Sequence, residues 1–307
     1  MDGVLPIFKD RGITSASCVY KVRSILGVRK AGHIGTLDPN VNGVLPICIG
    51  QATKLVSILM NRNKEYIGEM TLGVSTDTDD LDGKIKEKKK LNKPFSLKQI
   101  DFVFQNMLGT IYQTPPIYSA IKINGKRLYK YARNGEKVNI PKRKIKIYEF
   151  CRLGIPFFDD DIGIEKIKFR VQCSKGTYIR SLVSDFGKAL NVPSVMSSLT
   201  RTKSGGFSIE DTIKIDDLIK LKKNNDNFYY DKIYSIKSVL KNDFLYDLNY
   251  SQWVKVSNGC NIILPHSINK DKIVLVYDKL VKAIYQHNGN YYSPYIMLLN
   301  NHGVNGL

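Results

Sequence analysis

A hydrophobic repeat near the N-terminus predicts the first helix of the chain. Cys18, Val22, Ile25 and Leu26 recur at the spacing that places side chains on one face of a helix. Thr14 can cap the start of such a helix, and Gly27 can end it. The pattern therefore predicts a helix with one apolar face over residues 14–26.

Three later segments have the pattern of strands. Residues 44–49 form a short apolar run, and residues 166–173 alternate between apolar and polar side chains. Residues 66–74 alternate in the same way and place Tyr66, Met70, Leu72 and Val74 on one face. A chain that mixes such strands with helices is predicted to be of the α+β class.

Two further helices are predicted around these strands. Ser96 and Gln99 can form a capping box at the start of a helix that runs to Leu108. After a turn at residues 174–177, a second apolar stripe at helical spacing begins at Ile179.

The pattern changes beyond about residue 240. Short apolar runs follow, and Asn-Gly dipeptides, which favour turns, separate some of them. Because short runs with turn signals are typical of strands, we predict a small all-β domain over residues 241–307. The runs are residues 253–256, 262–264, 273–277 and 281–285.

The charge of the chain is large and unevenly distributed. Lys and Arg number 47 against 28 Asp and Glu, a net charge of +19. Residues 1–240 carry +17 of it and residues 241–307 only +2, and residues 120–147 hold ten basic residues and one acidic residue. Such an excess indicates a polyanionic partner, a nucleic acid or a membrane surface. A lysine-rich proteome is the alternative explanation, but the clustering indicates a patch.

The charged stretch at residues 77–90 is interpreted differently. Its lysines at 88–90 are accompanied by the acidic residues of 77–82. We therefore predict a solvated loop here and not a binding surface.

Several classes of protein are disfavoured by what the sequence lacks. The longest apolar runs are far shorter than the ~18 residues that a membrane span needs, and the first residues have no signal-peptide pattern, which favours a cytoplasmic location. The five cysteines and four histidines have no metal-ligand spacing, and no disulfide framework is suggested. Neither a P-loop nor a Rossmann glycine pattern is present, so we predict no metal and no cofactor.

Three residues are candidates for chemistry. Asp38 lies in a stretch rich in glycine and precedes a proline, so it is either a positioned carboxylate or an ordinary turn aspartate. Arg180 begins the predicted helix that follows residue 178, and it could keep a buried carboxylate ionised or simply cover a helix end. Tyr66 faces the apolar side of a strand, where a tyrosine is usually part of the core.

Taken in order, the motifs around these residues resemble the TruB family of tRNA pseudouridine synthases. The resemblance runs from residue 3 to about residue 210, and its most specific parts are Gly-His-Ile-Gly-Thr-Leu-Asp-Pro at 32–39 and Cys-Ser-Lys-Gly-Thr-Tyr-Ile-Arg-Ser-Leu at 173–182. Lys-Glu-Tyr at 64–66 and Pro-Pro-Ile-Tyr-Ser-Ala at 115–120 also match. The chain departs from the common pattern at Asp10, where proline is frequent, and at Val41, where alanine is common.

The resemblance implies a fold and a domain organisation. The family has a central mixed, mainly antiparallel sheet flanked by helices and loops, followed by a small all-β RNA-binding domain of the PUA type. We therefore expect a catalytic domain over residues 1–240, with a basic thumb-like insertion at about 120–147, and a PUA-like domain over residues 241–307. The match over the last 65 residues is loose.

The resemblance also implies an activity and a set of site residues. The family isomerises uridine 55 in the T loop of tRNA to pseudouridine without a cofactor. By this resemblance Asp38 is the nucleophile, although the atom of the nucleotide that it attacks is left open. Arg180 is its counter-charge, and Tyr66 stacks on the flipped base. His33 corresponds to the residue that fills the space left in the T loop. By the same resemblance, Tyr178 and Leu199 belong to the pocket wall, and Lys9 supports the loops.

The basic segment acquires a specific interpretation from the same resemblance. It resembles the thumb that clamps the T stem-loop of tRNA, through phosphate contacts that give affinity but little sequence information. The basic residues expected to bind RNA are Lys122, Lys126, Arg127, Lys130, Arg133 and Arg143.

Two alternative functions remain in view. One is a non-catalytic protein that binds or folds RNA on the same scaffold, which the presence of Asp38, Tyr66 and Arg180 disfavours. The other is the guide-RNA-dependent synthase of archaea and eukaryotes, which generally lacks the thumb insertion. We therefore expect a monomeric enzyme that acts on tRNA without a guide RNA or a protein partner.

Overall fold

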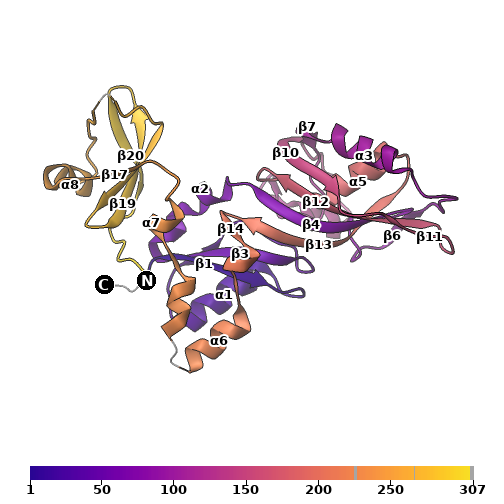
Figure 1. Ribbon diagram of the computed structural model, residues 1–307, viewed down its shortest axis with the longest axis horizontal. Coiled ribbons are helices and arrows are strands. Elements are labelled where there is room, and N and C mark those ends of the chain that lie inside the picture. The colour runs from indigo at the N-terminus through magenta and orange to yellow at the C-terminus, as the bar shows by residue number, and fades with distance from the viewer. Residues whose placement is uncertain (225–226, 266, 305–307) are drawn as a thin grey trace. The chain divides into compact units, whose positions relative to one another are not determined.

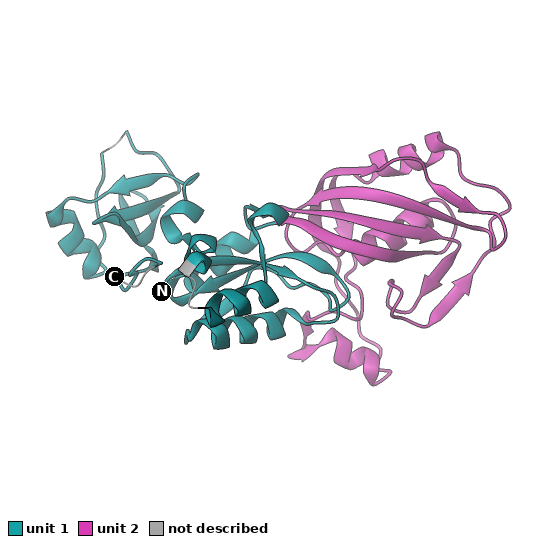
Figure 2. Ribbon diagram, turned by 60° about the horizontal axis from the view of Figure 1, so that its bottom comes forward, with its two compact units in different colours: residues 1–61, 204–307 teal, residues 62–203 magenta. Residues whose placement is uncertain are grey.

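The structure, a computed structural model, describes residues 1–224, 227–265 and 267–304. Its contacts divide the chain into two compact units (Figure 2): unit 1 comprises residues 1–61 and 204–307, and unit 2 comprises residues 62–203. The boundary that the sequence predicts near residue 240 falls inside unit 1, between α7 (Ile236–Val239) and β17 (Leu245–Asp247).

Unit 1 contains a mixed sheet built on its first strand. β1 (Gly3–Lys9) pairs antiparallel with β3 (Asn42–Ile49) and parallel with β15 (Ile213–Lys214). β2 (Ala31–His33) joins β3, and β16 (Tyr234–Ser235) joins β1. The chain between β2 and β3 carries Asp38, so this sheet positions that loop.

The first helix, α1 (Ser15–Leu26), is as the sequence predicts. The side chain of Thr14 accepts a hydrogen bond from the amide of Ser17, and Gly27 ends the helix in a left-handed conformation with φ of 65°. Cys18, Val22 and Leu26 are buried. α1 packs against α6 (Ile215–Lys223), and both are seen below the sheet in Figure 1.

The C-terminal part of unit 1 is a second sheet in the order β17-β18-β19-β20. Its strands besides β17 are β18 (Lys272–Tyr277), β19 (Leu280–Asn288) and β20 (Tyr291–Met297). The prediction of a strand-rich C-terminal part is confirmed. The apolar run at residues 253–256, however, lies in helix α8 (Tyr250–Ser257) and not in a strand.

Both ends of the chain are joined to the first sheet of unit 1. The buried carboxylate of Asp2 accepts a hydrogen bond from the amide of Gln51 through Oδ1 (2.6 Å) and from the amide of His302 through Oδ2 (2.9 Å). Val4 and Cys48 of the first sheet share one apolar core with residues of β18 and β19. These contacts explain why the last strands belong to unit 1.

Unit 2 is built on a long sheet in the order β13-β4-β12-β10-β7. β12 pairs antiparallel with both β4 and β10, and β10 pairs antiparallel with β7. The five strands are β4 (Lys64–Leu72), β7 (Gly109–Gln113), β10 (Arg143–Arg152), β12 (Ile164–Cys173) and β13 (Ser194–Ser204).

Two helices cover one face of this sheet (Figure 1), and they are α3 (Leu97–Asn106) and α5 (Ile179–Ala189). Phe104 of α3 and Phe186 of α5 contact Phe150 of β10, with ring centroids 4.5 and 6.1 Å from it. The predicted capping box of Ser96 at the start of α3 is confirmed. The result is the mixed, mainly antiparallel α+β fold that the sequence predicts.

The charged stretch at residues 77–90 is only partly a loop. β6 (Ile85–Lys88) pairs with β5 (Val74–Thr76) in a hairpin, so the loop prediction is wrong for these residues. The predicted strand over residues 66–74 is also too long, because β4 ends at Leu72, Gly73 has a positive φ of 102°, and Val74 begins β5. All four side chains of β6 are exposed and only Ile85 is apolar, so the segment has no alternation of apolar and polar residues that would indicate a strand.

The basic segment at residues 120–147 contains two different structures. Its first part has the short strands β8 (Lys122–Ile123) and β9 (Lys126–Arg127) and helix α4 (Leu128–Arg133). From Arg143 onward it is strand β10 of the sheet. The remaining elements are η1 (Gly50–Leu55), α2 (Val56–Met60), β11 (Phe157–Asp159), β14 (Phe207–Ser208), η2 (Ile209–Asp211) and η3 (Asn227–Lys232).

Candidate active site

The loop that carries Asp38 is held on both sides of that residue. Leu37 is buried, and its amide donates to the hydroxyl of Ser15 at 2.9 Å. The carbonyl of Pro39 accepts from the amide of Gly12 at 2.9 Å. With both neighbours fixed, the backbone at Asp38 has little freedom, which is what a reacting carboxylate needs.

Lys9 is the cation inside this loop structure. The side chain is fully buried, and its ammonium group donates to the carbonyls of Asp10 (3.0 Å), Ile13 (2.8 Å) and Pro39 (2.9 Å). An ammonium has three protons, so it joins the end of β1, the start of α1 and the residue after Asp38.

Removing this ammonium is expected to loosen the loop. Lys9→Met leaves the carbonyls of Asp10 and Ile13 without this donor, which should lower the free energy of unfolding by about 2–4 kcal/mol. Urea unfolding followed by circular dichroism measures the change. Lys21→Met, at an exposed position on α1, is the matched control and should be near neutral. The same free energy of unfolding for both variants and the wild type would contradict this function of Lys9.

His33 is also in unit 1, at the end of β2 opposite Ile47 of β3. It is half-buried and lies five residues before Asp38, at the start of the same loop. Lys9, His33 and Asp38 thus all belong to the loop region of unit 1, and the other predicted pocket residues belong to unit 2.

Tyr66 is a buried residue of β4 in unit 2, directly opposite Val171 of β12. Gly68, two residues further, faces the same side of the strand. A Cβ atom on Gly68 would lie 2.9 Å from Cδ1 of Leu199, so the absence of a side chain lets Leu199 pack against β4 beside Tyr66. The structure therefore places Leu199 against Gly68, two residues from Tyr66 on the same face of β4.

A second feature near Tyr66 is the buried ammonium of Lys64. Burial and the positive charge of Arg201 lower the pKa of Lys64 to about 8. Its Nζ donates to the carbonyl of Arg62 at 2.6 Å. This end of β4 thus presents positive charge.

Arg180 is buried at the start of α5 and is bound by several groups. Its guanidinium donates to the carbonyls of Thr78 (3.1 Å) and Tyr118 (3.0 Å), and it lies 3.6 Å from Oδ2 of Asp80. Burial raises the pKa of Asp80, and the charge of Arg180 opposes that rise. The arginine therefore fixes the acidic turn and the segment of Tyr118 on one helix end.

The start of α5 is itself anchored through Tyr178. The side-chain amide of Gln113, at the end of β7, donates to the carbonyl of Tyr178 (3.0 Å) and accepts from its amide (2.8 Å). Ser181 adds a hydrogen bond to the carbonyl of Thr114. The predicted residues Tyr178 and Arg180 are thus held together at one rigid helix end.

Asp80 and Gln113 are the two residues of this region that sequence reasoning missed. Asp80 stands in an acidic run, Asp-Thr-Asp-Asp at 77–80, but its partner Arg180 lies a hundred residues later in the chain. For Gln113 the sequence has no signal, since a glutamine at a strand end is common.

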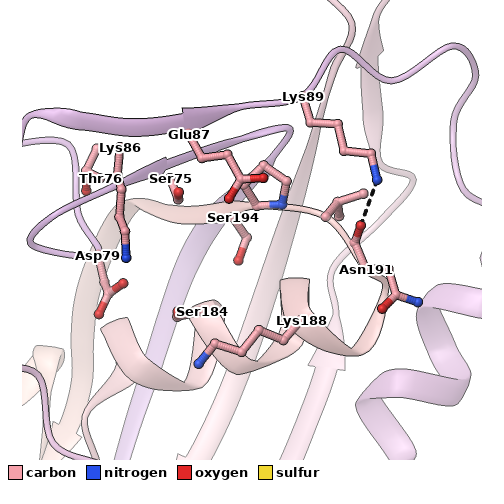
Figure 3. A pocket seen from close by; sticks show the side chains of 12 residues that line it. Ser75, Thr76, Asp79, Lys86, Glu87, Lys89, Ser184, Lys188, Asn191 and Ser194 are labelled. Atoms are coloured by element: carbon pink, nitrogen blue, oxygen red, sulfur yellow. Dashed lines mark hydrogen bonds between the residues drawn. The ribbon is translucent and has the colours of Figure 1, made fainter.

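One pocket of unit 2 lies elsewhere. It has a volume of about 470 Å³ and lies between the β5–β6 hairpin and α5, with side chains such as Asp79, Lys86 and Lys188 around it (Figure 3). None of Tyr66, Tyr178, Arg180 and Leu199 lines it. The pocket is therefore separate from the predicted site residues.

The segment described contains no cluster of three or more His, Cys, Asp or Glu side chains that could hold a metal ion. Within the same residues, no helix is long and apolar enough to cross a membrane.

Comparisons with known proteins place the chain in a family. The family model described as TruB family pseudouridylate synthase (N terminal domain) matches residues 23–179. tRNA pseudouridine synthase B of Latilactobacillus sakei is 45% identical, with 99% of this chain and 100% of that protein covered, and that of Ligilactobacillus salivarius is 48% identical, with 94% and 95% covered. A solved structure of an H/ACA RNP bound to a substrate RNA containing 2′-deoxyuridine has a chain of the same fold, with a TM-score of 0.71, 25% identity and 96% and 84% of the two chains covered. The chain therefore belongs to the TruB family of pseudouridylate synthases, as its motifs indicated.

Proposed function

We propose that this chain converts uridine 55 in the T loop of tRNA to pseudouridine, without a guide RNA. Relatives named tRNA pseudouridine synthase B match it over nearly their whole length. The observation that carries the proposal is the loop of Asp38, in which both neighbouring residues are fixed by buried groups while Asp38 itself keeps partial exposure. A carboxylate held in this way is suited to attack a substrate.

The reaction balances within the nucleotide. The bond from the sugar C1′ to the base N1 breaks, a bond from C1′ to C5 forms, the proton on C5 leaves, and N1 gains a proton. No oxidant, reductant or metal is needed for this exchange. Asp38 serves as the nucleophile, and Arg180 supports its negative charge.

Tyr66 stacks on the target base and is close to the C5 proton in this proposal. A phenol offers a flat ring for stacking and a hydroxyl for proton transfer. Leu199, which packs beside Tyr66, and Tyr178 form the apolar wall of the base pocket. The base reaches them by leaving its stack, which costs a few kcal/mol, and His33 fills the space that it leaves.

The position of the modification is the direct test of the proposed substrate. An unmodified tRNA transcript is incubated with the protein alone, treated with a carbodiimide that marks pseudouridine, and read by primer extension. We expect one stop, at position 55, and none in a transcript with cytidine at that position. Stops at other uridines with none at 55 would contradict the proposed substrate.

Of the predicted thumb-like insertion at about 120–147, the part over residues 120–142 is proposed to hold the T stem-loop, because Arg143, also predicted to bind RNA, begins strand β10 of the sheet. Lys126 makes contacts within the insertion, since its Nζ lies 2.6 Å from Oε1 of Glu136 and 4.7 Å from the ring centroid of Tyr131. Lys122, Arg127, Lys130 and Arg133 are exposed and available to phosphates. The internal ion pair shapes the insertion, and the exposed cations bind the RNA.

Neutralising two of these cations should weaken binding in a salt-dependent way. For Arg127→Ala with Lys130→Ala, we expect weaker tRNA binding and a slope of log K against log salt that is smaller by about 2. Lys88→Ala with Lys90→Ala is the matched control and should leave the slope unchanged. Fluorescence anisotropy over a salt series measures the tRNA affinity of both double variants. Equal slopes for the two would contradict the proposed binding of tRNA by the insertion.

We further propose that the protein acts as a monomer in the cytoplasm, with tRNA as its partner. No residue of the proposed chemistry needs a second chain or a cofactor. The charge of +19 fits a polyanionic substrate.

A further inference from the structure

One face of the unit 2 sheet is not covered by helices. In β10, the buried residues Ile145 and Ile147 alternate with the exposed residues Lys144, Lys146 and Tyr148. Because successive side chains of a strand point to opposite faces, these three exposed residues share the face that points away from the buried isoleucines.

The edge strand β7 extends this face. Tyr112 is directly opposite Lys144, and Thr110 is directly opposite Lys146. The side chain of Tyr112 is 68% exposed and that of Tyr148 is 43% exposed. Two accessible aromatic rings therefore lie at the two ends of a pair of lysines, and we call these four residues the tyrosine-lysine face.

The catalytic tyrosine proposed above lies on the other face of the same sheet. Tyr66 is directly opposite Val171, and Val171 is directly opposite Phe150, so the three share a face. Phe150 contacts Phe104 of α3, which identifies that face as the helix-covered one. A β-bulge between Ile147 and Glu149 shifts the alternation of β10, so Phe150 shares this face with Ile145 and Ile147 and not with the two lysines. The tyrosine-lysine face is thus separate from the face of Tyr66.

Its chemistry fits unpaired RNA better than a protein. Exposed rings stack on bases, and lysines contact phosphates. The Nζ of Lys146 lies 5.2 Å from the ring centroid of Tyr148, which places cation and ring together. The nearest carboxylate in the strand, that of Glu149, is paired with Arg170, so it does not cancel the charge of the lysines. Lysine, moreover, is depleted in the centres of protein interfaces.

We propose that Tyr112, Lys144, Lys146 and Tyr148 bind unpaired nucleotides of the substrate tRNA that lie outside the T arm. The proposal rests on the proposed function for the identity of the RNA. It adds a second contact to the T-arm site, on the opposite side of the sheet.

The experiment compares a full-length tRNA transcript with the isolated T stem-loop. Two double variants are used, Tyr112→Ala with Tyr148→Ala and Lys144→Ala with Lys146→Ala. For each, the Kd for full-length tRNA should rise at least about fivefold, while the Kd and turnover for the T stem-loop stay as in the wild type. The lysine variant should also reduce the salt slope for full-length tRNA by about 1.4.

Two further variants act as controls. Lys98→Ala with Phe102→Ala removes an exposed lysine and an exposed ring from α3, on the helix-covered side, and should leave both affinities unchanged. Tyr112→Phe with Tyr148→Phe keeps the rings and should keep the wild-type affinity, because stacking needs the ring and not the hydroxyl. Urea unfolding of each variant is measured to verify that it is folded.

The outcomes separate this proposal from the proposed function. Unchanged binding of full-length tRNA by both alanine variants would contradict the proposal that the tyrosine-lysine face binds RNA. A protein would then be the partner to test for this face. Equal losses for the two RNAs would overturn the placement outside the T arm. Absence of pseudouridine with the wild type would instead refute the proposed function, and the binding comparison would still decide this proposal.

Discussion

Replacing Asp38 by asparagine is expected to abolish pseudouridine formation, with turnover at least about a thousandfold lower than in the wild type. The amide has nearly the shape of the carboxylate but is a poor nucleophile and carries no charge. Two contacts that hold the loop use other groups, because Lys9 binds the carbonyl of Pro39 and Ser15 binds Leu37. The variant retains both of these contacts.

Binding separates this chemical effect from a structural one. Asp38→Asn should bind full-length tRNA within a few-fold of the wild type, because the phosphate contacts come from other residues. Single-turnover kinetics with the variant in excess over tRNA measures the chemical step. Turnover within tenfold of the wild type would dismiss Asp38 as the nucleophile, and the search for the reacting group would move to other carboxylates.

Replacing Arg180 by lysine is expected to reduce both stability and activity. A lysine cannot reach the carbonyls of Thr78 and Tyr118 and the carboxylate of Asp80 at once, because it lacks the planar fork of the guanidinium. We expect the free energy of unfolding to fall by about 2–4 kcal/mol, since buried acceptors lose a charged donor. Turnover should fall about a hundredfold or more as the end of α5 shifts.

A control on the same helix makes this prediction specific. Lys188 forms an exposed pair with Asp185, so Lys188→Ala should change the free energy of unfolding by less than about 0.5 kcal/mol. Urea unfolding and single-turnover kinetics are measured on both variants. If Arg180→Lys and Lys188→Ala have the same free energy of unfolding, the buried contacts of Arg180 with Asp80 and the two carbonyls do not stabilise the fold as predicted.

Local elements could be predicted from the sequence where a single signal was sufficient. The helix of Cys18, Val22 and Leu26 has a periodic face, a capping threonine and a terminal glycine, and all three are found in the structure. The capping box at Ser96 is confirmed for the same reason. The residues that make up such a signal lie close together in the sequence, so the sequence alone is sufficient to recognise it.

Two elements were misjudged because their signals are ambiguous. The run at residues 253–256 is only four residues long, and three of them are apolar, which fits a strand or a helix. Packing in unit 1 selects helix α8. The strand β6 has exposed polar side chains on both faces, and only its pairing with β5 reveals it. In both cases a contact outside the segment decides the structure.

The candidate site shows the same limit. The motifs identified Asp38, Tyr66 and Arg180 by their order in the chain, through family resemblance. The contact between Arg180 and Asp80, and that between Gln113 and Tyr178, join residues far apart in sequence. Spacing cannot predict such pairs, because they depend on which strand ends meet at the start of α5.

The central claim is that the chain isomerises a uridine of tRNA by itself, and release of tritium from C5 tests it most directly. A tRNA transcript labelled with tritium at C5 of every uridine is incubated with the purified protein and no other component. The C5 proton of the target uridine is lost when the new bond forms, so one equivalent of tritium per tRNA should appear in water. No release, under conditions where anisotropy shows the tRNA bound, would contradict the proposed isomerisation.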